Sequence, residues 1–80
     1  MAAITINRVA NDTKGLYVAQ VEGFDDVGEL TFSRASPTLV IVDHTGVPDS
    51  LRGQGVGSAL AERVVADARA EGFRIVPLCP

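Results

Sequence analysis

The sequence predicts an α/β protein, an α+β mixed sheet covered by one amphipathic helix. Three observations predict this fold class. Segments rich in β-branched residues, separated by polar turns, fill the first half of the chain. An apolar residue recurs every fourth position over residues 55–71, which is typical of an amphipathic helix. Another apolar segment follows that helix, so strand, helix and strand are expected to form a parallel crossover.

The first three strands are expected to form an antiparallel meander. They occupy residues 4–10, 16–22 and 27–34. Ile4 and Ile6 share one face of the first strand, and Leu30 and Phe32 face inward from the third. The polar turn before the second strand ends at Gly15, which is free to adopt a positive φ.

The fourth strand, over residues 38–45, has a different pattern. Residues 39–42 form a continuous apolar run, which predicts a central strand buried on both faces. If side chains alternate along the whole strand, His44 lies on the same face as Val40 and Val42.

The predicted helix at residues 55–71 has one apolar side. The stripe comprises Val56, Leu60, Val64 and Ala68, widened by Ala61 and Val65. The opposite side carries Glu62, Arg63, Asp67, Arg69 and Glu71. Gly72 lies where a helix normally ends. Residues 73–77 are then expected to form a fifth strand, parallel to the fourth.

Composition limits the class of protein. The chain has 80 residues, which suits a single domain over residues 1–80, and its apolar share of 46% argues against disorder. A net charge of −3 offers no cationic surface for nucleic acid. No apolar run approaches the roughly 20 residues of a membrane span, and no signal peptide opens the chain. The thin core of so short a chain leaves self-association open.

The chain contains one cysteine, Cys79, and one histidine, His44. A lone cysteine forms no internal disulfide, which favours a reducing cytoplasm. These two residues also supply too few soft ligands for a structural zinc site. We therefore expect a cytoplasmic protein without structural zinc.

A glycine-rich turn precedes the predicted helix. Gly53, Gly55 and Gly57 alternate with other residues, so the backbone there can approach a ligand closely. The first helical turn has N–H groups without internal partners and a partial positive charge, and Arg52 adds a full charge. These features predict a phosphate or pyrophosphate site, the alternative being a tight turn without a ligand.

Two familiar phosphate motifs do not match this turn. A P-loop needs a lysine after its glycines, and the turn has none. A dinucleotide fingerprint needs the spacing GxGxxG with an acidic residue about 20 positions later, whereas the spacing here is GxGxG.

The pattern that fits is [Q/R]xxGx[G/A], present here as Arg52-Gly53-Gln54-Gly55-Val56-Gly57. It resembles the acyl-CoA-binding turn of the GNAT N-acetyltransferase superfamily. The resemblance extends to a small single-domain branch through Asp43-His44-Thr45, Val47-Pro48, Leu51 to Leu60 and Pro77-Leu78-Cys79-Pro80. Members of that branch continue beyond this last motif into a helical segment, so the resemblance implies a GNAT-like domain that lacks its C-terminal helical part. Tyr17 lies in an early strand and is expected to be a packing residue and not the tyrosine acid that the missing segment supplies in many GNAT enzymes.

This resemblance implies transfer of an acetyl group from acetyl-CoA to a primary amine. The residues that it assigns to the cofactor are His44, Thr45, Val47, Arg52, Gly53, Gln54, Gly55, Val56, Gly57 and Ser58. Backbone N–H groups of residues 53–58 would bind the pyrophosphate, and the backbone of residues 44–47 would pair with the pantetheine amides. A non-catalytic CoA- or acyl-CoA-binding module is the main alternative. A structural or interaction protein with the same fold is the other.

Two residues are candidates for catalysis. His44 is a general base for the amine or, in the alternative, a strand-end residue that orients the following backbone. Cys79 is close to the cofactor thiol if the resemblance holds, where a thiolate could accept the acyl group; the alternative is a buried structural cysteine. Asp43 is expected to be structural and to hold the glycine-rich turn.

Overall fold

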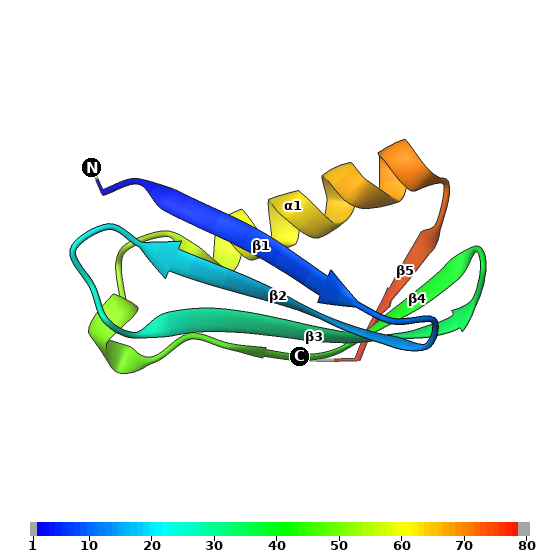
Figure 1. Ribbon diagram of the computed structural model, residues 1–80, viewed down its shortest axis with the longest axis horizontal. Coiled ribbons are helices and arrows are strands. Elements are labelled where there is room, and N and C mark those ends of the chain that lie inside the picture. Colours follow the sequence, from blue (N-terminus) through cyan, green and yellow to red (C-terminus); the bar gives the residue numbers. More distant parts are fainter. Residues whose placement is uncertain (1, 79–80) are drawn as a thin grey trace.

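The computed structural model describes residues 2–78, which form five strands, one α-helix and one 3-10 helix (Figure 1). The elements are β1 (Ile4–Ala10), β2 (Lys14–Val21), β3 (Val27–Ser36), β4 (Leu39–Gly46), η1 (Asp49–Leu51), α1 (Val56–Glu71) and β5 (Arg74–Pro77). Their order confirms the prediction. β2 begins earlier and β3 ends later than expected, because the antiparallel ladders continue through polar residues such as Lys14, which lies opposite Ser33.

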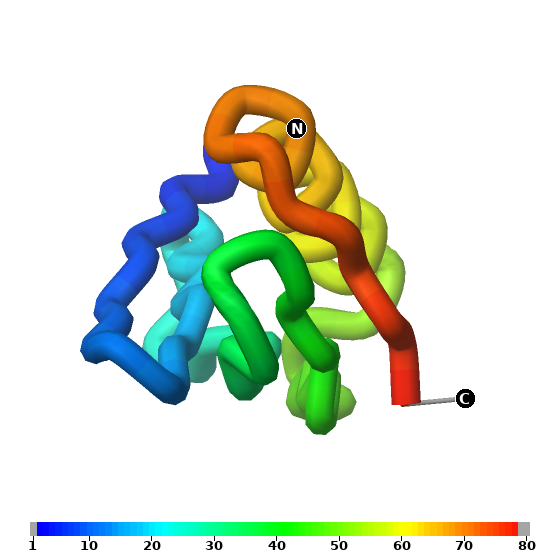
Figure 2. Tube along the Cα trace, turned by 90° about the vertical axis from the view of Figure 1, so that its right-hand side faces the viewer, coloured from blue at the N-terminus to red at the C-terminus, as the bar shows by residue number. Residues whose placement is uncertain are grey.

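The strands form one mixed sheet in the order β1-β2-β3-β4-β5. β1 to β4 are antiparallel, whereas β5 runs parallel to β4 with Ile75 opposite Val40. The predicted meander and crossover are therefore confirmed. In Figure 2 the edge strands β1 and β5 lie on opposite sides of the molecule, with α1 between them.

One face of the sheet packs against α1 and forms the core. The helix contributes Val56, Leu60 and Val64, all of them buried. The predicted apolar stripe is wider than the observed one, since Ala61 is exposed and Val65 is 41% exposed. Both residues line a groove between α1 and the four-residue strand β5, which is too short to cover them.

The expectation that β4 is buried on both faces is wrong. Val40 and Val42 are buried, but Leu39 and Ile41, which alternate with them along the strand, are only half-buried. α1 covers the face that carries Val40 and Val42, and within residues 2–78 no other helix covers the opposite face. The continuous apolar run therefore reflects a partly exposed sheet face rather than a second layer.

Gly15 lies within β2 and does not have a positive φ, contrary to expectation. A Cβ atom at this position would overlap the ring of Phe32 on the neighbouring strand. Glycine is thus required here for close packing of an aromatic ring, and not for a turn.

A charged cluster joins α1 to the hairpin of β1 and β2. The Tyr17 hydroxyl donates a hydrogen bond to Asp67 Oδ2 at 2.7 Å, and Arg63 Nε donates to the same oxygen at 3.2 Å. Arg8 Nη1 lies 3.1 Å from Asp67 Oδ2. Tyr17 is a buried packing residue, as expected, whereas Arg63 and Asp67 face the sheet rather than the solvent side that was predicted.

This cluster shifts the pKa values of Tyr17 and Asp67. Burial and then the hydrogen bond to Asp67 raise the pKa of Tyr17. Burial also opposes ionisation of Asp67, but the hydrogen bonds from Tyr17 and Arg63 outweigh it, so the pKa of Asp67 is lowered. The folded state therefore favours a neutral Tyr17 beside an ionised Asp67.

Asp67→Asn should reduce the free energy of unfolding by about 1–2 kcal/mol at neutral pH. A carboxyl with a lowered folded pKa contributes stability above its unfolded value, near 3.8, and this contribution is lost as pH falls through the folded pKa. In urea unfolding, the difference in free energy of unfolding between variant and wild type should therefore be smaller at about pH 3 than at about pH 7. Glu62→Gln, at an exposed site on the same helix, is the control. An equal difference at both pH values would contradict the assignment.

Candidate functional site

The glycine-rich turn joins η1 to the first turn of α1. Leu51 is fully buried and anchors η1, and Val56 is buried at the start of α1. Between them the chain reverses through Gly53, with φ 84°, and Gly55, with φ 76°. Both values lie in the left-handed region, which side-chain-bearing residues rarely adopt. The two glycines are thus required by the backbone, and Gly57, in open space on α1, is not.

The turn presents backbone N–H groups without acceptors. No side chain caps α1, and its first backbone hydrogen bond runs from Ala59 N to Gly55 O at 3.0 Å. Within the described chain, no acceptor faces the N–H groups of Gly53, Gly55, Val56, Gly57 and Ser58. An uncapped helix start of this kind favours an anionic ligand.

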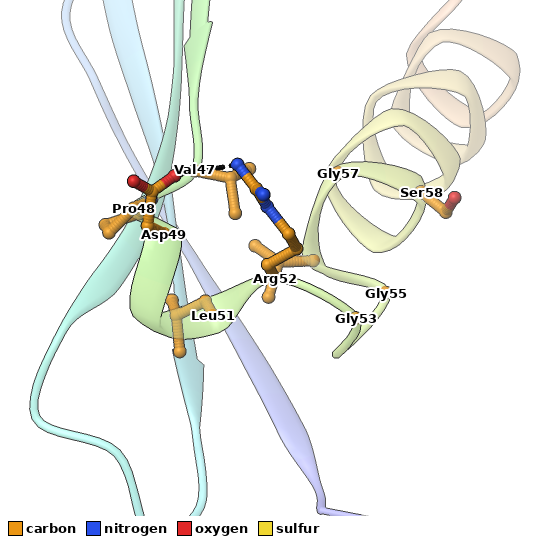
Figure 3. A pocket seen from close by; sticks show the side chains of 10 residues that line it. Val47, Pro48, Asp49, Leu51, Arg52, Gly53, Gly55, Gly57 and Ser58 are labelled. Atoms are coloured by element: carbon orange, nitrogen blue, oxygen red, sulfur yellow. Dashed lines mark hydrogen bonds and ion pairs between the residues drawn. The ribbon is translucent and has the colours of Figure 1, made fainter.

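A pocket of about 330 Å³ lies over this turn. Its lining residues are Val47, Pro48, Asp49, Leu51, Arg52, Gly53, Gly55, Val56, Gly57 and Ser58 (Figure 3). Arg52 Nη2 is 3.0 Å from Asp49 Oδ1, and both side chains are largely exposed. Among the described residues that line the pocket, Arg52 alone has a full positive charge, and it is paired with the carboxylate of Asp49, which an incoming anion would have to displace.

A β-bulge at Asp43 changes which way the following side chains point. Phe32 lies opposite Val42, but Thr31 lies opposite His44, so Asp43 is the extra residue. The extra residue reverses the alternation. His44 consequently lies on the face opposite Val42, and the expectation that the two share a face is wrong.

Asp43 and His44, the polar residues of the bulge, have different surroundings. Ser33 Oγ donates a hydrogen bond to Asp43 Oδ2 at 2.6 Å, so Asp43 is tied to β3 and does not hold the glycine-rich turn as expected. His44 is exposed, and its Nε2 would lie 3.2 Å from a Cβ atom at Gly46. The missing side chain at Gly46 leaves one side of the imidazole open.

At the end of β4, residues 2–78 leave one backbone edge unpaired. Pairing with β5 reaches Val42 opposite Pro77, and Leu78 N donates to Val42 O at 3.1 Å. From Asp43 to Gly46, no described residue pairs with the edge of β4 that faces β5. Backbone groups there are available to an extended ligand.

The structure brings most of the predicted cofactor residues together. Those that line the pocket are Val47, Arg52, Gly53, Gly55, Val56, Gly57 and Ser58. Thr45 lies beside it on the helix-facing side of β4, lining the neighbouring groove, and His44 lies on the opposite face. Gln54 is half-buried outside the pocket, where its N–H donates to Leu51 O. Cys79, the other catalytic candidate, lies outside the described residues.

A family model described as GCN5-related N-acetyl-transferase matches residues 16–80 of the 80-residue chain. The chain belongs to this family. Membership supports acetyl transfer as its general activity. The comparison with curated proteins found no match. None of the helices in residues 2–78 is long and apolar enough to cross a membrane.

Sequence reasoning missed two residues that shape this candidate site. Gly28 lies under α1, where a Cβ atom would overlap Val56 and push the first helical turn away from the sheet. A glycine inside a predicted strand is a signal for such close approach. Asp49 was also missed, although its three-residue spacing from Arg52 in a polar turn favours an ion pair.

Asp49→Asn should tighten binding of inorganic pyrophosphate two- to fivefold, because the anion no longer has to displace a carboxylate from Arg52. Isothermal titration at low and high salt measures this, and the gain should shrink as salt rises. Asp12→Asn, in the β1–β2 turn, removes the same charge away from the pocket and is the control. Weaker binding in Asp49→Asn would show that Asp49 supports the site instead.

Proposed function

We propose that the protein transfers an acetyl group from acetyl-CoA to a primary amine. The observation that carries this proposal is the glycine-rich turn, whose unpaired N–H groups at the start of α1 adjoin the free edge of β4. The N–H groups at the start of α1 suit a phosphate, and the edge of β4 suits an extended ligand with amide groups. Together they suit the pyrophosphate of CoA and the pantetheine arm attached to it.

The residues present fit this cofactor. The N–H groups of residues 53–58, apart from that of Gln54, can bind the pyrophosphate, and Arg52 can pair with a further phosphate oxygen. Gly53 and Gly55 hold the left-handed turn on which these N–H groups lie. Neither residue has a Cβ atom that could obstruct a phosphate. The free backbone from His44 to Val47 can pair with the pantetheine amides as an added strand.

His44 is the proposed general base. An alkyl ammonium group, with a pKa of about 10.4, has to lose its proton before it can attack a thioester. The neutral amine attacks the thioester carbonyl of acetyl-CoA, where a C–N bond forms and the C–S bond breaks. CoA leaves as a thiolate, which takes up the second amine proton. The exposed imidazole of His44, directly or through a water molecule, accepts the ammonium proton. Cys79 is the other proposed catalytic residue, as an acyl acceptor.

A non-catalytic acyl-CoA-binding module is the second candidate. One observation favours it: within residues 2–78 the imidazole of His44 has no hydrogen-bonding side chain to orient it. Working histidine bases are usually oriented by a third group.

CoA and acetyl-CoA should raise the midpoint of thermal unfolding, and ADP should raise it less. A ligand at 100 times its Kd stabilises a protein by about 2.7 kcal/mol, which corresponds to a shift of roughly 10–20 °C for a domain of this size. Gly57→Asp places a carboxylate at the phosphate site and should abolish the shift. Asp suits the first turn of a helix, and Gly57 faces open space, so the variant should fold.

Gly57→Asn is the matched control, with the same shape and no charge. It should keep most of the CoA shift if the phosphates bind at this turn. An unchanged midpoint with CoA at millimolar concentration would overturn the proposal, and equal shifts in Gly57→Asp and wild type would place the phosphates elsewhere.

His44→Ala should lower turnover at least tenfold while leaving the Kd for CoA nearly unchanged, because general-base catalysis contributes roughly 10²–10⁴-fold. Release of the CoA thiol from acetyl-CoA, with N-α-acetyl-lysine amide and spermidine as acceptors, measures turnover. Thr31→Val, which alters the residue opposite His44, is the control. Normal turnover with weaker CoA binding in His44→Ala would assign His44 to binding instead.

A further inference from the structure

A second groove, of about 340 Å³, lies between α1 and the ends of β4 and β5. Its lining residues are Leu30, Val42, Thr45, Ala61, Val64, Val65, Ile75 and Pro77. None of them is charged, and only Thr45 has a polar side chain. The volume lies at the lower end of the range for small-molecule sites, roughly 300–1,000 Å³.

The groove lies next to the proposed phosphate site. Thr45, in β4, lines the groove, and Val47, just after β4, lines the pocket over the glycine-rich turn. Along α1, Ser58 lines that pocket and Ala61, one helical turn further on, lines the groove. A ligand with its phosphates at the turn can therefore extend along the end of β4 into the groove.

The chemistry of the lining selects the occupant. A charged amine acceptor would find no carboxylate among the lining residues, and an ionised group would lose hydration without compensation. A hydrocarbon chain gains by leaving water in contact with these side chains. Val65 is 41% exposed, so a hydrocarbon chain in the groove would remove apolar surface of this residue from water.

We propose that this groove binds the hydrocarbon part of an acyl-CoA, so that the protein accepts acyl groups longer than acetyl, up to about hexanoyl. This inference rests on the proposed function and extends its substrate class. Ala61 lines the groove with a small side chain, so a larger side chain at this position should shorten the acyl chain that fits.

The test compares dissociation constants for CoA, acetyl-CoA, butyryl-CoA and hexanoyl-CoA by isothermal titration. Each buried methylene is expected to tighten binding about two- to fourfold, so hexanoyl-CoA should bind at least tenfold more tightly than acetyl-CoA. Ala61→Phe should reduce this ratio below threefold without changing the Kd for CoA. Ala70→Phe, also exposed on α1 but outside the groove, should keep the wild-type ratio.

Val65→Thr nearly preserves shape and adds a hydroxyl to the groove wall, so it should lower the ratio even if Ala61→Phe perturbs folding. CoA binding with no dependence on chain length would overturn this inference and leave the proposed function standing. If Ala61→Phe weakens CoA and hexanoyl-CoA equally, the groove holds another part of the cofactor and the inference is wrong. No binding of CoA at all would overturn both proposals.

Discussion

The first turn of α1 lies close to β3 because Gly28 has no side chain. A Cβ atom there would overlap Val56, the residue that starts the helix and is itself buried. Leu51, on the other side of the glycine-rich turn, is equally buried. The turn is therefore held at both ends by the core, and with Gly53 and Gly55 in the left-handed region its N–H groups, apart from that of Gln54, find no acceptor among residues 2–78. The core thus prearranges the proposed anion site, to which none of residues 2–78 contributes a side-chain cap.

The bulge at Asp43 has a comparable effect on the end of β4. The extra residue puts His44 on the open face of the sheet and Thr45 on the face covered by α1. The free backbone edge runs between the two faces. In the proposed reaction, the base and the acyl group would therefore lie on opposite faces of one strand, joined by the backbone that holds the cofactor. Such an arrangement lets the acceptor approach from the uncovered face without crossing the acyl groove.

Local patterns predicted the fold well, because each element is encoded by residues close in sequence. The four-residue recurrence of Val56, Leu60 and Val64 predicted α1, and Gly72, with φ 77°, ends it where expected. The errors concern contacts between elements. The apolar run at residues 39–42 indicated two covered faces, but only the packed structure shows that α1 covers one. Likewise, the partner of Asp67 is Tyr17, fifty positions away in the chain.

The sequence by itself determined the element order, the glycine-rich turn and the resemblance to N-acetyltransferases, since each depends on short-range spacing. Tertiary structure alone decided which way the functional groups point. A bulge depends on the register between β3 and β4, so the side of the sheet that His44 occupies could not follow from alternation. The ion pair of Arg52 with Asp49 and the groove beside Ala61 also depend on how the turn and β5 pack against α1. Spacing along the chain encodes the helix and the strands, whereas register and packing between these elements decide where the functional side chains lie.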